Sequence, residues 1–152
     1  MVDPMRRPLV AGNWKMNGWQ RSTAELAKIL TGENVSERRA ALEATAQLIG
    51  LLSACGARHH DLNLKNVLLA RGTSRDDSII AHVLDVDRVE FGRPGDSRVT
   101  ERNLDRFMRS ARKWRELYGA RVEEAELVRV AASVRRFVSS RPSSGARAST
   151  RS

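Results

Sequence analysis

Cysteine, long apolar runs and a targeting sequence are scarce or missing in this chain of 152 residues. The single cysteine, Cys55, permits no internal disulfide, which fits a reducing compartment. No stretch reaches the roughly 18 consecutive apolar residues that a membrane-spanning helix needs. The N-terminal residues also lack the apolar core of a secretory signal. We therefore expect a cytoplasmic protein.

Lysine is scarce as well: it supplies only four of the 27 basic residues, against 18 acidic ones. The resulting net charge of +9 and pI near 11.1 favour contact with phosphates, nucleic acid or lipid headgroups. An arginine-rich genome with a basic tail accounts for the charge equally well. The basic residues show no aromatic interleaving and no zinc-finger or heptad pattern, so sequence-specific nucleic-acid binding is not expected.

Hydrophobic periodicity predicts a mostly helical α+β fold of one modest domain. A capped amphipathic helix is expected wherever apolar residues recur at spacings of three and four, as at Ala41, Ala44, Leu48, Leu51 and Leu52. The expected elements are a strand at 8–12, a helix from Ser22 or Thr23 to Leu30, a helix from Ser36 to Gly56, strands at 67–69 and 79–84, and helices from Glu101 through Leu117 and from Glu123 to Val138.

The stretch "RHHDLNLKNVLL" contains the spacing H-x-D-L-x-x-x-N, with His59, Asp61 and Asn66 at the specified positions. In a phosphotransferase loop of this kind, the aspartate orients an attacking hydroxyl and the asparagine holds a Mg²⁺ ion. Asp85 follows an apolar strand 19 residues after Asn66, where a second metal-binding carboxylate is expected. The alternative interpretation treats Asp61, Asn63 and Asn66 as turn residues and Asp85 as a strand-end cap.

Three segments, "HHDLNLKNVLLA", "HVLDVDR" and "RNLDRFMRSARKW", resemble the lipopolysaccharide core kinases, nearest to 3-deoxy-D-manno-octulosonic acid (Kdo) kinase. The resemblance covers about residues 36–118 and implies the C-terminal lobe of a protein-kinase-like fold. It implies ATP and Mg²⁺ as cofactors, with Asp61 catalytic, His59 holding the loop, and Asn66 and Asp85 binding the metal. The implied acceptor is a sugar hydroxyl on a lipid A precursor, reached by peripheral contact with the inner membrane. Val86 replaces the family's phenylalanine.

The nucleotide-binding lobe has no counterpart in this sequence. No G-x-G-x-x-G occurs, and nothing positions Lys15 with Glu25 or Glu37 as the lysine–glutamate pair of a kinase. We therefore expect a kinase-like C-lobe without a complete N-lobe, truncated or chimeric, with impaired activity. A gene fusion, a frameshift or a misassigned start would each produce such a chain.

The front of the chain, "RRPLVAGNWKMNG" at residues 6–18, resembles the first strand of triosephosphate isomerase. That resemblance gives Asn13 and Lys15 substrate-binding roles. A (β/α)₈ barrel typically needs about 250 residues, so isomerase activity is not expected. The predicted division is an isomerase-like segment at 1–32, loosely docked, a kinase-like lobe at 33–138 and a disordered basic tail at 139–152.

A third possibility is a non-catalytic basic module that binds anionic lipid or lipopolysaccharide. It rests on the arginines between positions 102 and 115, which are expected on the side of their helix opposite the apolar residues. A solvated helix face explains the same pattern. The sequence leaves the oligomeric state open.

Overall fold

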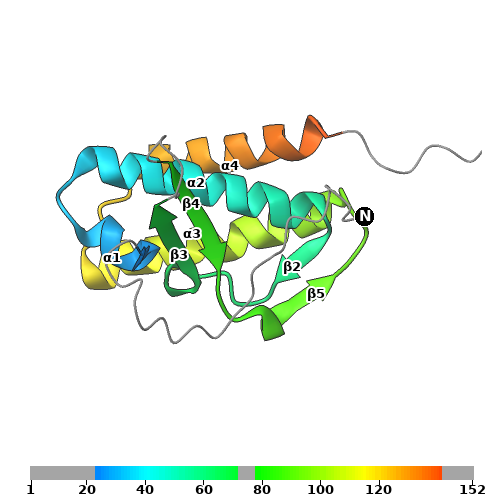
Figure 1. Ribbon diagram of the computed structural model, residues 1–152, viewed down its shortest axis with the longest axis horizontal. Helices are drawn as coiled ribbons and strands as arrows, with labels where there is room; N and C mark the ends of the chain where they lie inside the picture. Colours follow the sequence, from blue (N-terminus) through cyan, green and yellow to red (C-terminus); the bar gives the residue numbers. More distant parts are fainter. Residues whose placement is uncertain (1–22, 72–77, 142–152) are drawn as a thin grey trace, which may run out of the picture.

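The computed structural model describes residues 23–71 and 78–141. Nine helices and strands and two short 3₁₀ turns form the described part, and they confirm the mixed α+β, mostly helical class (Figure 1). In chain order they are β1 (Thr23–Glu25), α1 (Leu26–Thr31), α2 (Val35–Ala54), β2 (Ala57–His59), η1 (Leu64–Asn66), β3 (Val67–Arg71), β4 (Ile79–Val83), η2 (Val86–Arg88), β5 (Val89–Phe91), α3 (Ser97–Tyr118) and α4 (Glu124–Ser139).

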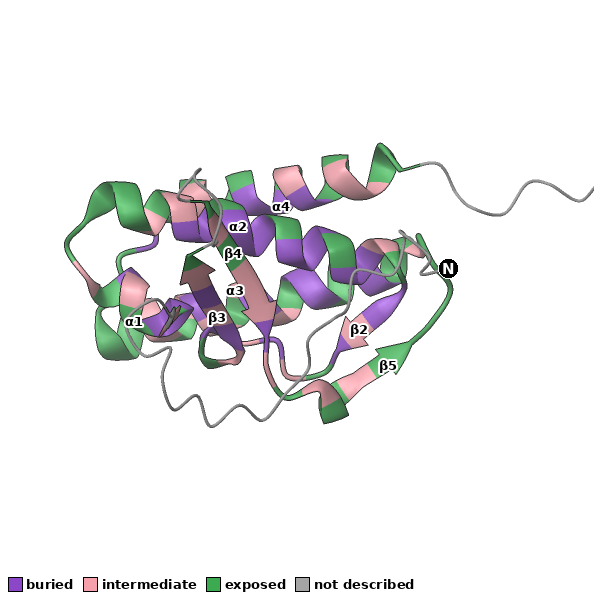
Figure 2. Cartoon of the chain, viewed as in Figure 1, coloured by how far each residue is buried: buried purple, intermediate pink, exposed green. Residues whose placement is uncertain are grey.

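Helix α2 forms the centre of the molecule and packs against α3, α4 and β4 (Figure 1). It begins after Asn34, whose side chain accepts a hydrogen bond from the Glu37 N–H. Most of its residues from Ala41 to Ser53 are buried, because neighbouring elements cover several of its faces (Figure 2). Leu51 departs from the predicted apolar stripe and is exposed.

Two small antiparallel sheets lie beside this helix. One has the order β1-β3-β4, with Leu69 opposite both Ala24 and Ala81. The other pairs β2 with β5, with Arg58 opposite Glu90. The β2–β5 pair was not predicted from the sequence, because strands of three residues carry too little periodicity.

The segment before residue 32 differs from expectation in two ways. Residues Thr23–Glu25 form strand β1 rather than the first turn of a helix, because pairing with β3 outweighs the helical preference of the local sequence. The described part of this segment, residues 23–31, is also packed in the main core rather than loosely docked, with Leu26, Ala27 and Leu30 buried there. The Arg121 N–H also donates a hydrogen bond to the Leu30 carbonyl at 2.6 Å.

The two C-terminal helices begin at side-chain caps. Helix α3 starts at Ser97, four residues earlier than predicted, because the Asp96 carboxylate accepts a hydrogen bond from the Arg98 N–H. Helix α4 starts with a capping box between Glu123 and Glu126. Its C-terminus extends to Ser139, one residue into the predicted tail.

The strand predicted at 8–12 and the tail beyond Arg141 lie outside the described residues. Among the helices in the described ranges, none combines the length and the apolar character needed to cross a bilayer.

Candidate active site

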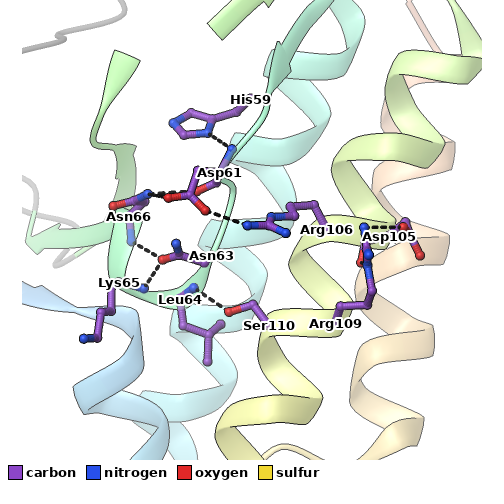
Figure 3. Close-up of polar contacts among 10 residues, drawn as sticks. All are labelled: His59, Asp61, Asn63, Leu64, Lys65, Asn66, Asp105, Arg106, Arg109 and Ser110. Carbon is purple, nitrogen blue, oxygen red and sulfur yellow. Dashed lines mark hydrogen bonds and ion pairs between the residues drawn. The ribbon is translucent and has the colours of Figure 1, made fainter. Parts of the chain in front are cut away.

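The polypeptide between β2 and β3 forms a compact loop built largely from its own side chains. The Asn63 side-chain oxygen accepts hydrogen bonds from the N–H groups of Lys65 (2.9 Å) and Asn66 (3.1 Å), which fixes η1. Asn66 in turn donates through Nδ2 to the Asp61 carbonyl at 2.8 Å and lies 3.4 Å from Asp61 Oδ2 (Figure 3). The local sequence thus brings the two predicted site residues, Asp61 and Asn66, together.

His59 anchors the start of this loop. Its ring is buried, its Nδ1 accepts a hydrogen bond from the Asp61 N–H at 3.1 Å, and its Nε2 donates to the Leu84 carbonyl at 2.8 Å. Both ring nitrogens are therefore engaged in a neutral tautomer. His59 holds the loop against the end of β4, in keeping with the role that the resemblance implied.

Asp85 lies at the end of β4, in a turn that is tied to both ends of the loop. The Leu84 N–H donates to the Asn66 carbonyl, and the His60 N–H donates to the Arg88 carbonyl, each at 2.8 Å. Asp85 adopts φ 59° and ψ 52°, the only positive φ among the non-glycine residues described. Backbone strain of this kind clusters at functional sites.

The interpretation of these polar residues as turn formers holds for Asn63 and lacks support for Asp85. Asp85 occupies the N-cap position of η2, but its side chain makes no capping hydrogen bond. Its exposed carboxylate has no hydrogen-bond or ion-pair partner within residues 23–71 and 78–141. The turn that carries this unpaired carboxylate is joined to Asn66 through the backbone of Leu84.

Helix α3 supports the loop from a distance of more than 40 residues in sequence. Asn103 is fully buried and accepts a hydrogen bond from the His59 N–H at 3.0 Å while donating to the Ala57 carbonyl at 2.9 Å. Ser110, two turns later, accepts from the Leu64 N–H at 3.2 Å. These two residues were not identified as functional from the sequence, although their spacing of seven places them on one face of the helix.

Arg106 lies between them and contacts the Asp61 carboxylate, with Nη2 at 2.8 Å from Oδ1 (Figure 3). Its predicted place on the solvated side of α3 is therefore wrong, because this position borders the face that packs on the loop. The hydrogen bond from Arg106 is the largest cause of a lowered Asp61 pKa, and partial burial opposes it. Asp61 is consequently ionised at neutral pH.

The remaining arginines of this region are largely engaged in exposed ion pairs. Arg109 pairs with Asp105 one turn earlier in α3, and both Arg112 and Arg115 pair with Glu124 at the start of α4. The predicted arginine face is thus partly neutralised by local carboxylates.

Replacing Asn103 with leucine is expected to destabilise the protein by about 3 kcal/mol, because it leaves the buried His59 N–H and Ala57 carbonyl without partners. Urea denaturation followed by circular dichroism measures the change. Ser110→Ala, which removes one partly buried hydrogen bond, serves as the control and is expected to cost about 1 kcal/mol. Equal stabilities for Asn103→Leu and the wild type would contradict the bridging role.

The model of the Lipopolysaccharide kinase (Kdo/WaaP) family matches residues 14–120 of the chain. Among solved structures, the chain resembles one described as WaaP in complex with acyl carrier protein, with a TM-score of 0.52 and 22% sequence identity. That match covers 68% of this chain and only 39% of the WaaP chain, so this chain spans well under half of its length. At this identity the likeness shows the fold alone. A comparison with curated proteins gave no match.

Neither match supports the isomerase-like segment. The family match begins at residue 14, inside the stretch 6–18 on which that resemblance rested, and well before residue 36. Asn13 and Lys15 lie outside the described residues, so their roles stay predictions.

Proposed function

Because the chain belongs to the lipopolysaccharide kinase (Kdo/WaaP) family, we propose that it carries the phosphoryl-transfer loop of an ATP-dependent sugar kinase. The observation that supports this most is the hydrogen-bonded unit of Asp61 and Asn66, with Asp85 held beside it by backbone hydrogen bonds at 84 and 88. The proposed reaction transfers the γ-phosphoryl group of ATP to a hydroxyl of a lipopolysaccharide-precursor sugar.

In this proposal Asp61 orients the acceptor hydroxyl and accepts its proton. Oδ1 is bonded to Arg106 at 2.8 Å, whereas the contact of Oδ2 with Asn66 is long, at 3.4 Å, so Oδ2 is the less engaged oxygen and the one proposed to meet the hydroxyl. Phosphoryl transfer depends mainly on positioning and charge stabilisation, so a fixed carboxylate suits the reaction.

The residues present fit a Mg²⁺ ion, which prefers oxygen ligands. The Asn66 side-chain oxygen accepts no hydrogen bond from the described residues, since that side chain bonds through Nδ2. The Asp85 carboxylate is also unpaired within the same ranges. These two groups would hold the ion, which would supply positive charge to offset that of the nucleotide phosphates. Within the described ranges, no site gathers three or more histidine, cysteine, aspartate or glutamate residues for a metal. The proposed site includes one such residue, Asp85, together with the amide of Asn66.

Positive charge beside the loop fits an anionic acceptor. Arg102, Arg106 and Lys113 follow one another at spacings of four and seven and lie on one side of α3, named here the α3 stripe. Arg102 and Lys113 are exposed and have no hydrogen-bond or ion-pair partner within residues 23–71 and 78–141. We propose that they face the phosphates of a lipid A precursor at the inner membrane surface. The acyl carrier protein bound to WaaP is a second candidate partner.

Purified chain is expected to transfer phosphate slowly, at least about 100-fold below the 1–100 s⁻¹ typical of kinases. The reason is that the sequence contains no G-x-G-x-x-G to hold the nucleotide phosphates and no pattern that positions Lys15 with Glu25 or Glu37. The measurement is transfer of radiolabelled γ-phosphate from Mg-ATP to a Kdo-lipid A acceptor under single-turnover conditions.

The control for this assay omits Mg²⁺ and is expected to give no transfer. A turnover rate of about 1–100 s⁻¹, which is typical of kinases, would contradict the expected impairment. A chain that binds acceptor-containing anionic vesicles but transfers no phosphate would instead favour a non-catalytic basic module.

A further inference from the structure

Besides the contact of Lys65 with the Trp114 ring, helix α3 makes three side-chain hydrogen bonds to the catalytic loop, and one of the three differs in kind from the other two. Asn103 and Ser110 accept hydrogen bonds from backbone N–H groups, of His59 and Leu64. Arg106 instead binds the side chain of Asp61 (Figure 3). Backbone contacts fix the path of the loop, whereas the Arg106 contact fixes the orientation of the proposed reacting group.

We propose that Arg106 is a positioning residue, which holds Asp61 Oδ1 so that Oδ2 is presented to the acceptor hydroxyl. This inference rests on the proposed phosphotransferase function and adds to it a residue that the catalytic-loop motif does not contain.

The carboxylate is held from two sides. Arg106 Nη2 lies 2.8 Å from Oδ1, and Asn66 Nδ2 lies 3.4 Å from Oδ2 while bonding the Asp61 carbonyl at 2.8 Å. Partial rotation of the carboxylate about its last side-chain bond would move its oxygen away from Nη2 and weaken the charge-assisted bond to Arg106. The ion pair therefore fixes the plane of the carboxylate, with one oxygen bonded to Arg106 and the other directed away from it.

The scaffold under Arg106 is rigid enough for this role. Its neighbour Phe107 is fully buried in the main core. Asn103, one turn earlier, is also fully buried and accepts a hydrogen bond from the His59 N–H. A side chain on a packed helix positions a group more accurately than one on a loop.

Arg109, on the same helix, forms an ion pair that does not involve the loop. It pairs with Asp105 four residues earlier, and both side chains are about two-thirds exposed, at 63% and 64%. Arg106 and Asp61 are more shielded, at 43% and 35%. Arg109 and Asp105 lie on a different side of α3 from the loop (Figure 3). Arg109→Gln is therefore a matched control for Arg106→Gln.

The test combines transfer kinetics with a titration that needs no activity. Arg106→Gln is expected to lower the single-turnover rate about tenfold to 100-fold, the scale of a misplaced catalytic group, with the KM for ATP unchanged. Carbon NMR of the Asp61 carboxyl is expected to show its titration midpoint moving up in Arg106→Gln, because the cation that lowers its pKa is gone. Arg109→Gln is expected to leave both quantities at wild-type values. Arg106→Lys is expected to recover part of each.

The outcomes separate the two proposals. A folded Arg106→Gln chain with the wild-type transfer rate and an unmoved Asp61 midpoint overturns the positioning role. Absence of transfer in the wild type overturns the proposed function, and the titration then still decides whether Arg106 holds Asp61. If Arg106→Gln does not fold, Arg106→Lys and a salt series on the wild type replace it. Added salt screens the Arg106–Asp61 ion pair, so the titration midpoint of the Asp61 carboxyl must then rise with the salt concentration. An unchanged titration midpoint overturns the contact.

Discussion

Asp61→Asn is expected to reduce phosphoryl transfer by about 100-fold to 10,000-fold, the contribution typical of a positioned general base. Asparagine has almost the same shape as aspartate, so the loop keeps its backbone hydrogen bonds to His59 and Asn66. What it loses is the negative charge that attracts the hydroxyl proton and the Arg106 guanidinium. Transfer of radiolabelled phosphate, with unfolding followed in parallel, measures the effect.

The control is Asp105→Asn, which removes an exposed carboxylate of α3 that pairs with Arg109. It is expected to change the transfer rate less than twofold, since exposed ion pairs contribute at most about 1 kcal/mol to stability and this one lies away from the loop. Similar losses in both variants would contradict a catalytic role for Asp61.

Because Arg106 lowers the Asp61 pKa, wild-type transfer is expected to persist as the pH falls below the usual aspartate range. It is lost only when the pH falls through the lowered pKa of Asp61.

Gly56→Ala is expected to destabilise the protein by about 3 kcal/mol, which lowers the melting temperature by roughly 10 °C in a chain of this length. Gly56 has φ 76°, a conformation that costs other residues about 1–2 kcal/mol. An added Cβ would also lie 2.5 Å from the Gly92 carbonyl oxygen and 2.9 Å from that of Arg93. These are backbone atoms, so the β2–β5 pairing would have to shift.

Gly95→Ala provides the control for this prediction. Gly95 also has φ 76°, but a Cβ there meets no atom within 4 Å. Its substitution therefore carries the conformational cost alone, about 1–2 kcal/mol. Thermal unfolding of both variants separates conformational strain from the close backbone approach. Equal losses of stability in the two variants would show that the close approach of Gly92 to Gly56 does not contribute to the cost of the Gly56 substitution.

Local sequence was sufficient for features whose partners lie a few residues apart. The long helix, the β3 and β4 strands and the Asp61–Asn66 loop all follow from short-range spacing. Asn63, for example, bonds the N–H groups two and three residues ahead of it. The predicted helix ends were less accurate, as at the start of α3 at Ser97, because several polar residues compete as caps.

The sequence by itself determined the loop that joins Asp61 to Asn66, because those contacts close within five residues. Only the tertiary structure decided that residues 23–25 form a strand and that Arg106 meets Asp61 rather than water. Those contacts join residues that are far apart in the sequence: Thr23 pairs with Ala70 across 47 positions, and Arg106 bonds Asp61 across 45. Their partners are selected by how α1, α2 and α3 pack around one core, which no local pattern records.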